Sequence, residues 1–154
     1  MPLDVIAQRA GVGAGTVHRH FPTKESLIAA VVTSRLARLA ERAEGLAGAA
    51  DPAAAFVAFI RELTAEARHN VALAGALGGA GIGADGAAAA AALAAALGLL
   101  LARAQHGGGV RPDLTVPDLY AILAGVIAME RGLPAGRQGI GLDVVIDGLT
   151  THPA

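Results

Sequence analysis

The stretch LDVIAQRAGVGAGTVHRHFPTK, residues 3–24, decides how the N-terminal part of this chain folds. Its first half is rich in helix formers and stops at Gly11, and its second half, residues 14–20, stops at a Phe-Pro step. Ala7 is small enough for a second helix to cross closely, and Gly11 tolerates the positive φ that a tight turn requires. Val17, six residues after that glycine, supplies an aliphatic anchor. This spacing predicts two short crossed helices, a helix-turn-helix.

Composition narrows the class of protein before any motif is considered. Hydrophobic residues make up 54% of the 154 residues and charged residues 16%, which argues against a disordered chain. The absence of cysteine excludes a disulfide scaffold, a cysteine-ligated zinc site and a thiol nucleophile. Aromatic residues are only 3%, with no tryptophan, so a base-stacking platform for single strands is not expected.

Charge is unevenly distributed along the chain. Residues 1–42 carry a net charge of +3, whereas residues 43–154 carry −4, which gives the overall −1. Contact with a nucleic acid must therefore come from a local basic patch. We expect two domains: a head with the start of a connecting helix in residues 1–42, and a helical body in residues 43–154.

The body shows helical periodicity, and strand signals are absent. Thr23, the Asp51–Pro52 pair and Asp85 look like helix starts, and Thr115 with Asp118 resembles a capping box. The glycine-rich stretch between Val71 and Gly86 breaks the pattern. The sequence predicts an all-α protein of about eight helices, with long ones near residues 23–46, 52–67, 85–105 and 116–131 and a last one at 142–149.

The segment AGVGAGTVHRHFPTKESL resembles the signature of the TetR family of bacterial transcriptional regulators, and VRPDLTVPDLYAILAGV resembles the approach to that family's penultimate helix. The matching residues are Ile6, Ala7, Ala10, Gly11, Val12, Gly15, Thr16, Val17, His20, Phe21, Thr23, Lys24 and Leu27. The resemblance implies a helix-turn-helix DNA-binding head followed by a TetR-like helical bundle for ligand binding and dimerisation. Gly13 stands where the family usually has a Ser or Thr helix cap, a change that costs only a few tenths of a kcal/mol.

The resemblance also implies a further helix ahead of Pro2, which would cover Ile6, Val17, Phe21 and Leu27. Losing that cover forfeits up to about 1.5–3 kcal/mol for each side chain. We therefore expect a head that lacks its first helix and is loosely packed, and a native start upstream of Met1.

The helix from residue 14 is expected to enter a major groove of DNA, because small residues at its start permit close approach of the backbone. Thr16 and His20 can donate to phosphates, and Lys24 adds positive charge at the start of the next helix. By resemblance, His18 replaces a tyrosine that contacts the backbone and base edges. The expected DNA-contacting residues are Ala14, Thr16, Val17, His18, His20 and Lys24. Without the motif, Lys24 and Arg19 would be read as ordinary solvated charges.

These features lead to the hypothesis of a cytoplasmic, ligand-responsive homodimer, a probable repressor, that binds palindromic operator DNA. The last two long helices, about Val116–Arg131 and Leu142–Leu149, would form the dimer interface. A small apolar effector would occupy a pocket in the body without any cofactor. Its candidate walls are Phe56, Phe59, Leu63, Leu93 and Leu97.

Other classes of function have less support. A truncated regulator that dimerises, and binds a ligand or partner without gripping DNA, is the main alternative, motivated by Asp4 and the lack of a basic arm. An enzyme is not expected, because no nucleophile elbow, phosphate-binding loop or convincing carboxylate pair is present. No metal site is expected, because His18 and His20 point to different faces of a helix. The uncharged stretch from Gly86 to Ala102 is shorter than the ~20 residues of a membrane span.

Overall fold

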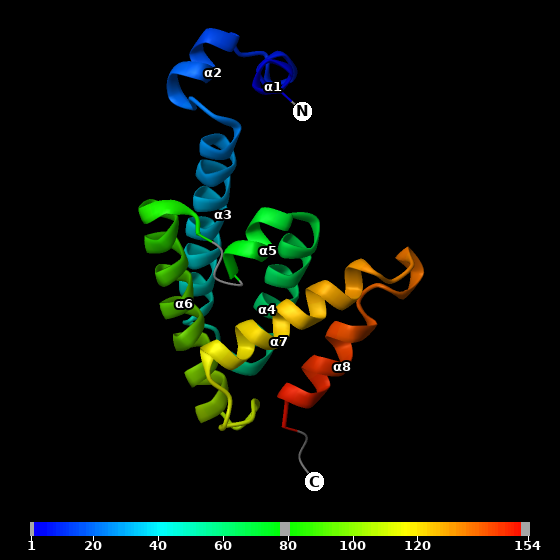
Figure 1. Ribbon diagram of the computed structural model, residues 1–154. Coiled ribbons are helices and arrows are strands. Elements are labelled where there is room, and N and C mark those ends of the chain that lie inside the picture. The colour runs from blue at the N-terminus through cyan, green and yellow to red at the C-terminus, as the bar shows by residue number, and fades with distance from the viewer. Residues whose placement is uncertain (1, 78–80, 152–154) are drawn as a thin grey trace.

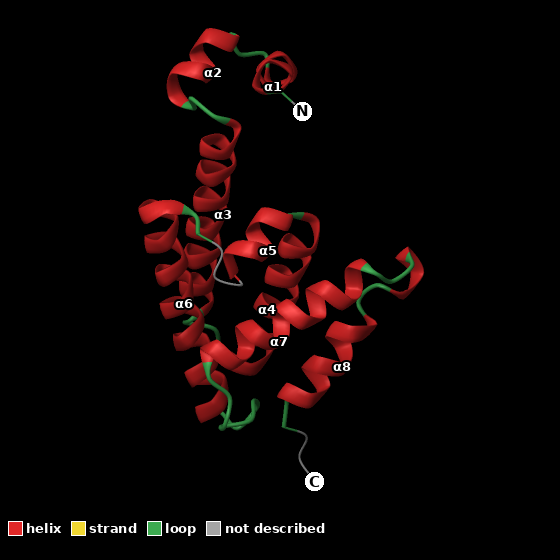
Figure 2. Cartoon of the chain, viewed as in Figure 1, coloured by secondary structure: helices red, strands yellow, loops and turns green. Residues whose placement is uncertain are grey.

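The computed structural model describes residues 2–77 and 81–151, and within these ranges the chain is all helical apart from loops and one isolated β-bridge (Figure 1, Figure 2). The predicted all-α fold, with about eight helices, is confirmed for these residues. The helices are α1 (Leu3–Ala10), α2 (Ala14–His20), α3 (Lys24–Leu46), α4 (Pro52–His69), α5 (Val71–Leu77), α6 (Gly83–His106), α7 (Val116–Arg131) and α8 (Ile140–Leu149), with a 3-10 turn at Ala135–Arg137.

Figure 1 shows a small head carried on a long stem. Helices α1 and α2 lie beyond the end of α3, whose lower part runs into the body beside α6. Helices α4 and α5 pack in the middle of the body, and α7 runs from beside the lower part of α6 across the body to pair with α8. The stem means that any movement of α3 within the body must displace the head.

Three of the predicted helix starts are confirmed by their caps. The Thr23 hydroxyl accepts from the Ser26 N–H at 3.1 Å while the Ser26 hydroxyl accepts from the Thr23 N–H at 3.2 Å, a reciprocal capping box. Asp51 accepts from the Ala54 N–H at 2.9 Å, with a proline as the first residue of α4. Thr115 opens α7 in the same way as Thr23, with Asp118 as its partner.

The glycine-rich region differs from the prediction in two respects. Asp85 is not a cap: α6 begins earlier, at Gly83, with Ile82 in the capping position and Asp85 within the first turn. There its carboxylate still lies at the positive end of the helix dipole. The predicted break after Val71 is delayed by the short helix α5, where the Asn70 side chain accepts from the Leu73 N–H at 3.0 Å. Residues 78–80 of this stretch lie outside the described ranges.

The core is formed where α3, α4 and α6 meet. Alanines on α3 and α6, such as Ala43 and Ala104, are fully buried, so these two helices can approach closely. Helix α6 is long and apolar enough to cross a membrane by length and composition, and it is the one described helix that meets this test. One face of this helix packs against protein, since Leu93 and Leu97 are completely buried against the rest of the body, whereas Leu99 on another face is exposed.

The end of α8 is tied to the loop between α6 and α7. The Arg111 N–H donates to the Leu149 carbonyl at 3.0 Å, and the Thr151 N–H donates to the Gly109 carbonyl at 3.2 Å. The Gln105 side chain donates to two carbonyls of the same loop, those of Arg111 and Leu114. The two backbone bonds anchor the C-terminal end of α8 to this loop, and the Gln105 bonds hold the loop itself in place.

Candidate DNA-binding head and regulatory body

The turn between α1 and α2 has the predicted left-handed glycine. Gly11 has φ 68°, and its N–H donates to the Gln8 carbonyl at 3.2 Å, while the Val12 N–H donates back to the Ala7 carbonyl at 3.0 Å. These two bonds satisfy the last carbonyls of α1 and reverse the chain. Ala7 is 1% exposed, as expected for the residue at a close helix crossing. The helix-turn-helix is therefore confirmed, with α2 as its second helix.

Helix α2 presents almost its whole surface to solvent. It contains no buried residue, and Val17 is its one partly buried side chain. The expected DNA-contacting residues Ala14, Thr16, His18, His20 and Lys24 are all exposed. The start of α2 carries no side-chain cap, so Gly13 leaves the amide groups there free of a hydroxyl partner. An uncapped, exposed helix start with small residues is suited to approach by an anionic backbone.

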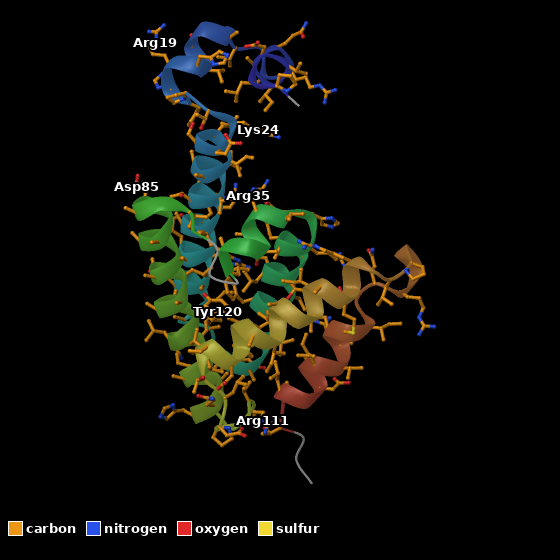
Figure 3. All side chains as sticks on the ribbon, in the orientation of Figure 1. Arg19, Lys24, Arg35, Asp85, Arg111 and Tyr120 are labelled. Atoms are coloured by element: carbon orange, nitrogen blue, oxygen red, sulfur yellow. The ribbon has the colours of Figure 1, made fainter. Side chains whose placement is uncertain are left out.

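Basic side chains surround α2. Its last turn holds His18, Arg19 and His20 with no acidic residue in its first turn, and Figure 3 shows Arg19 at the end of the head farthest from the body. Lys24 follows at the start of α3. Arg19 thus places positive charge on the outer side of the head, whereas Lys24 places it where the head joins the stem.

Asp4 and His18 make a contact within the head that the sequence alone does not predict. The His18 Nε2 atom lies 2.8 Å from an Asp4 carboxylate oxygen, which joins α2 to the first turn of α1. Both side chains remain at least half exposed, so the contact is a surface interaction of modest strength. It occupies Nε2 of the His18 ring, so a phosphate that binds this nitrogen must compete with Asp4.

The apolar side of the head is incompletely covered in this structure. Four side chains, which by the family resemblance a further helix would cover, are each only partly buried: Ile6, Val17, Phe21 and Leu27. A hollow of about 420 Å³, which Ile6 and Leu27 help to line, lies between α1, α3 and α5. Its lining residues are Ile6, Leu27, Ile28, Val31, Val32, Asn70 and Ala72. The helical repeat of these residues in the sequence indicated a buried face but gave no sign of a hollow.

The five predicted walls of an effector pocket lie together in the core. Phe56, Phe59 and Leu63 come from α4, Leu93 and Leu97 come from α6, and each is at most 1% exposed. None of them lines the hollows that open beside α3. These side chains pack against one another as core residues, so an effector at this place would have to separate them, and their role as pocket walls stays a prediction.

A polar hollow on the surface of the body escaped sequence reasoning. Its volume is about 480 Å³ and it lies where α3 meets the end of α4. Arg35 on α3 donates to Glu66 on α4 at 2.6 Å across its edge, and Figure 3 shows Arg35 on the stem below the head. The remaining lining is Glu62, Ala65, His69 and Asn70. The polar residues that α4 contributes to this lining are three or four apart and so share one face of the helix. This spacing is visible in the sequence, but any solvent-exposed helix has it.

Helices α7 and α8 keep an apolar surface in contact with solvent. Met129, Ile140 and Val144 are 52%, 45% and 66% exposed, although Leu123, Leu142 and Ile146 of the same helices are buried in the core. Ile140 and Val144 are four residues apart and share one face of α8. On α7, burial raises the pKa of the Tyr120 hydroxyl to about 12.

Comparisons with known proteins agree with this architecture. Residues 2–31 match the family model for bacterial regulatory proteins of the tetR family, and residues 51–151 match the model for the C-terminal domain of SbtR-like transcriptional regulators. No curated protein matches the chain.

Two solved structures are similar over nearly the whole chain. A TetR transcription regulatory protein from Mycobacterium vanbaalenii is 38% identical with a TM-score of 0.69, and the match covers 98% of this chain and 84% of that one. A TetR transcriptional regulator from Streptomyces coelicolor is 33% identical with a TM-score of 0.72, covering 96% of this chain and 86% of that one. The chain therefore belongs to the TetR family of bacterial transcriptional regulators, as its helix-turn-helix segment predicts.

Proposed function

We propose that the protein is a cytoplasmic repressor that binds a palindromic operator as a homodimer and releases it when a small apolar effector binds. In this division, residues 1–42 form the head with the start of the connecting helix, and residues 43–154 form the regulatory body. The observation that carries the proposal is helix α2, which has no buried residue and stands at the far end of a stem.

DNA recognition would work through the exposed part of the head. Helix α2 would enter the major groove with Ala14 at its start, where small side chains let the backbone approach the duplex. Thr16, His18 and His20 would donate to phosphates or base edges, and Lys24 would add a charge contact from α3. Val17 would stay on the inner side, where it keeps α2 against α1.

Dimerisation would bury the apolar face of α7 and α8 against the same face of a second copy. Met129, Ile140 and Val144 are large apolar side chains exposed on one pair of helices, and a twofold interface is self-complementary. The two heads would then meet successive major grooves, about 34–36 Å apart, as paired recognition helices require.

Effector binding would act within the body. The apolar side chains Phe56, Phe59, Leu63, Leu93 and Leu97 would form the walls, and a ligand inserted between α4 and α6 would move α3 and hence the head. Such a ligand shifts DNA affinity only by as much as it prefers one head position over the other. No catalytic step is required by this scheme, in keeping with a family of DNA-binding regulators.

Selection of bound duplexes from a random-sequence pool, followed by gel shifts over a series of salt concentrations, tests the DNA part of the proposal. We expect a palindromic consensus and an affinity that falls steeply with salt, because phosphate contacts release counterions. A dimer that selects no sequence would favour the alternative, a regulator that dimerises without gripping DNA. The contact of Asp4 with His18, which sets a carboxylate beside the recognition helix, is the feature that favours this alternative.

A further inference from the structure

Glu130 lies in an unfavourable place for a glutamate in two respects, its position in the helix and its burial. It lies in the last turn of α7, where the negative end of the helix dipole disfavours a carboxylate, and it is completely buried. No other acidic side chain is buried among the described residues. A buried carboxylate is costly unless its oxygens are all engaged, so its partners matter.

The partners come from two other helices. One Glu130 oxygen accepts from the Gly139 N–H at 2.9 Å and from the Leu142 N–H at 3.2 Å. The other oxygen accepts from Arg68 of α4 at 3.3 Å, and the Arg68 side chain is itself only 23% exposed. The carboxylate therefore joins α4, α7 and the beginning of α8.

The bonds to α8 have the pattern of a helix cap supplied by another helix. Gly139 is the residue before α8 and Leu142 is its third residue, the two positions whose N–H groups a capping box satisfies. Gly139 has no side chain to cap the helix itself. Glu130 thus satisfies two amide groups of α8, whose positive end in turn offsets the unfavourable position of the carboxylate.

The same contact sets the exposed apolar face. Met129 precedes Glu130, and a Cβ at Gly141 would lie 2.4 Å from the Met129 terminal methyl group, so the Met129 side chain of α7 lies against the first turn of α8. Ile140 lies between the two amide groups that Glu130 binds, with Val144 one turn later. The position of α8 relative to Met129 therefore depends on the carboxylate.

We propose that Glu130, held by Arg68, is a positioning residue for dimerisation: it fixes where α8 begins and so sets Met129, Ile140 and Val144 in the register that a second copy recognises. This inference rests on the proposed homodimer. Since Arg68 lies at the end of α4, the same link would carry a displacement of α4 to the dimer interface.

Sedimentation velocity and hydrogen exchange on the full chain test the proposal with three variants. Glu130→Ala should raise the dimer dissociation constant at least about tenfold and accelerate exchange in residues 139–143, because the two amide groups lose their acceptor. Glu130→Gln keeps one carbonyl oxygen for those groups and should raise the constant by no more than about threefold. Glu62→Ala removes an exposed contact with Arg42, 3.3 Å long, on helices other than α7 and α8, and serves as the control with no change expected.

The outcomes separate the inference from the homodimer itself. A wild-type protein that stays monomeric overturns the homodimer and this inference with it. A wild-type dimer that Glu130→Ala leaves intact, or that Glu130→Gln weakens as much as Glu130→Ala, overturns the inference alone. If Glu130→Ala does not fold, Arg68→Met takes its place, with an expected rise of about three- to tenfold, and an unchanged constant would overturn the inference.

Discussion

The head and the body of this protein are stabilised in different ways. In the head, α2 buries no residue and α1 buries only Leu3 and Ala7, so its shape depends on a left-handed glycine, backbone turns and helix caps. In the body, Phe56, Phe59 and their neighbours are fully removed from water. Most side chains of α2 are therefore exposed to solvent, whereas the apolar side chains of the body stabilise its fold.

The largest expected difference between the two regions is in their response to truncated side chains. Phe59→Ala should lower the free energy of unfolding by about 3–5 kcal/mol, because a fully buried ring leaves a cavity. Val17→Ala should cost about 1 kcal/mol, because that side chain is only partly buried. Denaturant unfolding measures both, and equal losses would mean that the head is as tightly packed as the body.

Removal of a basic side chain should affect DNA binding in the head and not in the body. Lys24→Gln should weaken DNA binding to all sequences alike and reduce the slope of log affinity against log salt by about 1, with little effect on stability. Arg103→Gln is the matched control, because Arg103 is an exposed cation on α6, at the end of the body away from the head. The same slope for both variants would remove Lys24 from the proposed contacts.

Removal of a helix cap should lower stability where the first turn of the helix is exposed to solvent. Thr115→Ala should cost about 1 kcal/mol at neutral pH, because the reciprocal bonds with Asp118 are lost. The bonds that the Asp118 carboxylate accepts from the Thr115 hydroxyl and N–H lower the pKa of Asp118 from its ordinary 3.8, so their part of the stabilisation is present above pH 3.8 and is lost as the pH falls through the lowered value. Thermal melts across this acid range should therefore show the wild type and Thr115→Ala converging, whereas a constant gap would contradict the account.

The smallest expected effect is at the contact between the two head helices. Asp4→Asn should strengthen DNA binding by up to about fivefold, since it removes a negative charge beside the duplex and frees His18 for phosphate. Glu44→Gln, an exposed acid at the body end of α3, should leave affinity unchanged. Weaker binding after Asp4→Asn would show that the orientation of the His18 ring matters more than the charge.

The head could be read from the sequence because its determinants are local. The bounds of α1 and α2, the left-handed Gly11 and the cap at Thr23 each follow from residues within one turn of each other. The caps at Asp51 and Thr115 in the body are equally local and could be predicted for the same reason. A capping oxygen needs only its neighbours in the chain to find its donor.

Several features of the body could not be predicted in this way, because they depend on contacts between residues that are distant in the sequence. Asp85 has the side chain of a cap, yet α6 begins before it. Glu130 reads in sequence as an ordinary surface charge, and only the packing of α4 and α8 makes it a buried link. The hollows beside α3 likewise depend on how α4 and α5 pack. The DNA-contacting residues and the effector walls remain predictions.

Hydrogen exchange in the presence of a selected operator duplex tests the central claim most directly. If α2 is the surface that reads DNA, the backbone amides of residues 14–24 should exchange more slowly on adding the duplex, while those of α4 and α6 in the core keep their rates. Slowed exchange on α7 and α8 without any change in residues 14–24 would contradict the account.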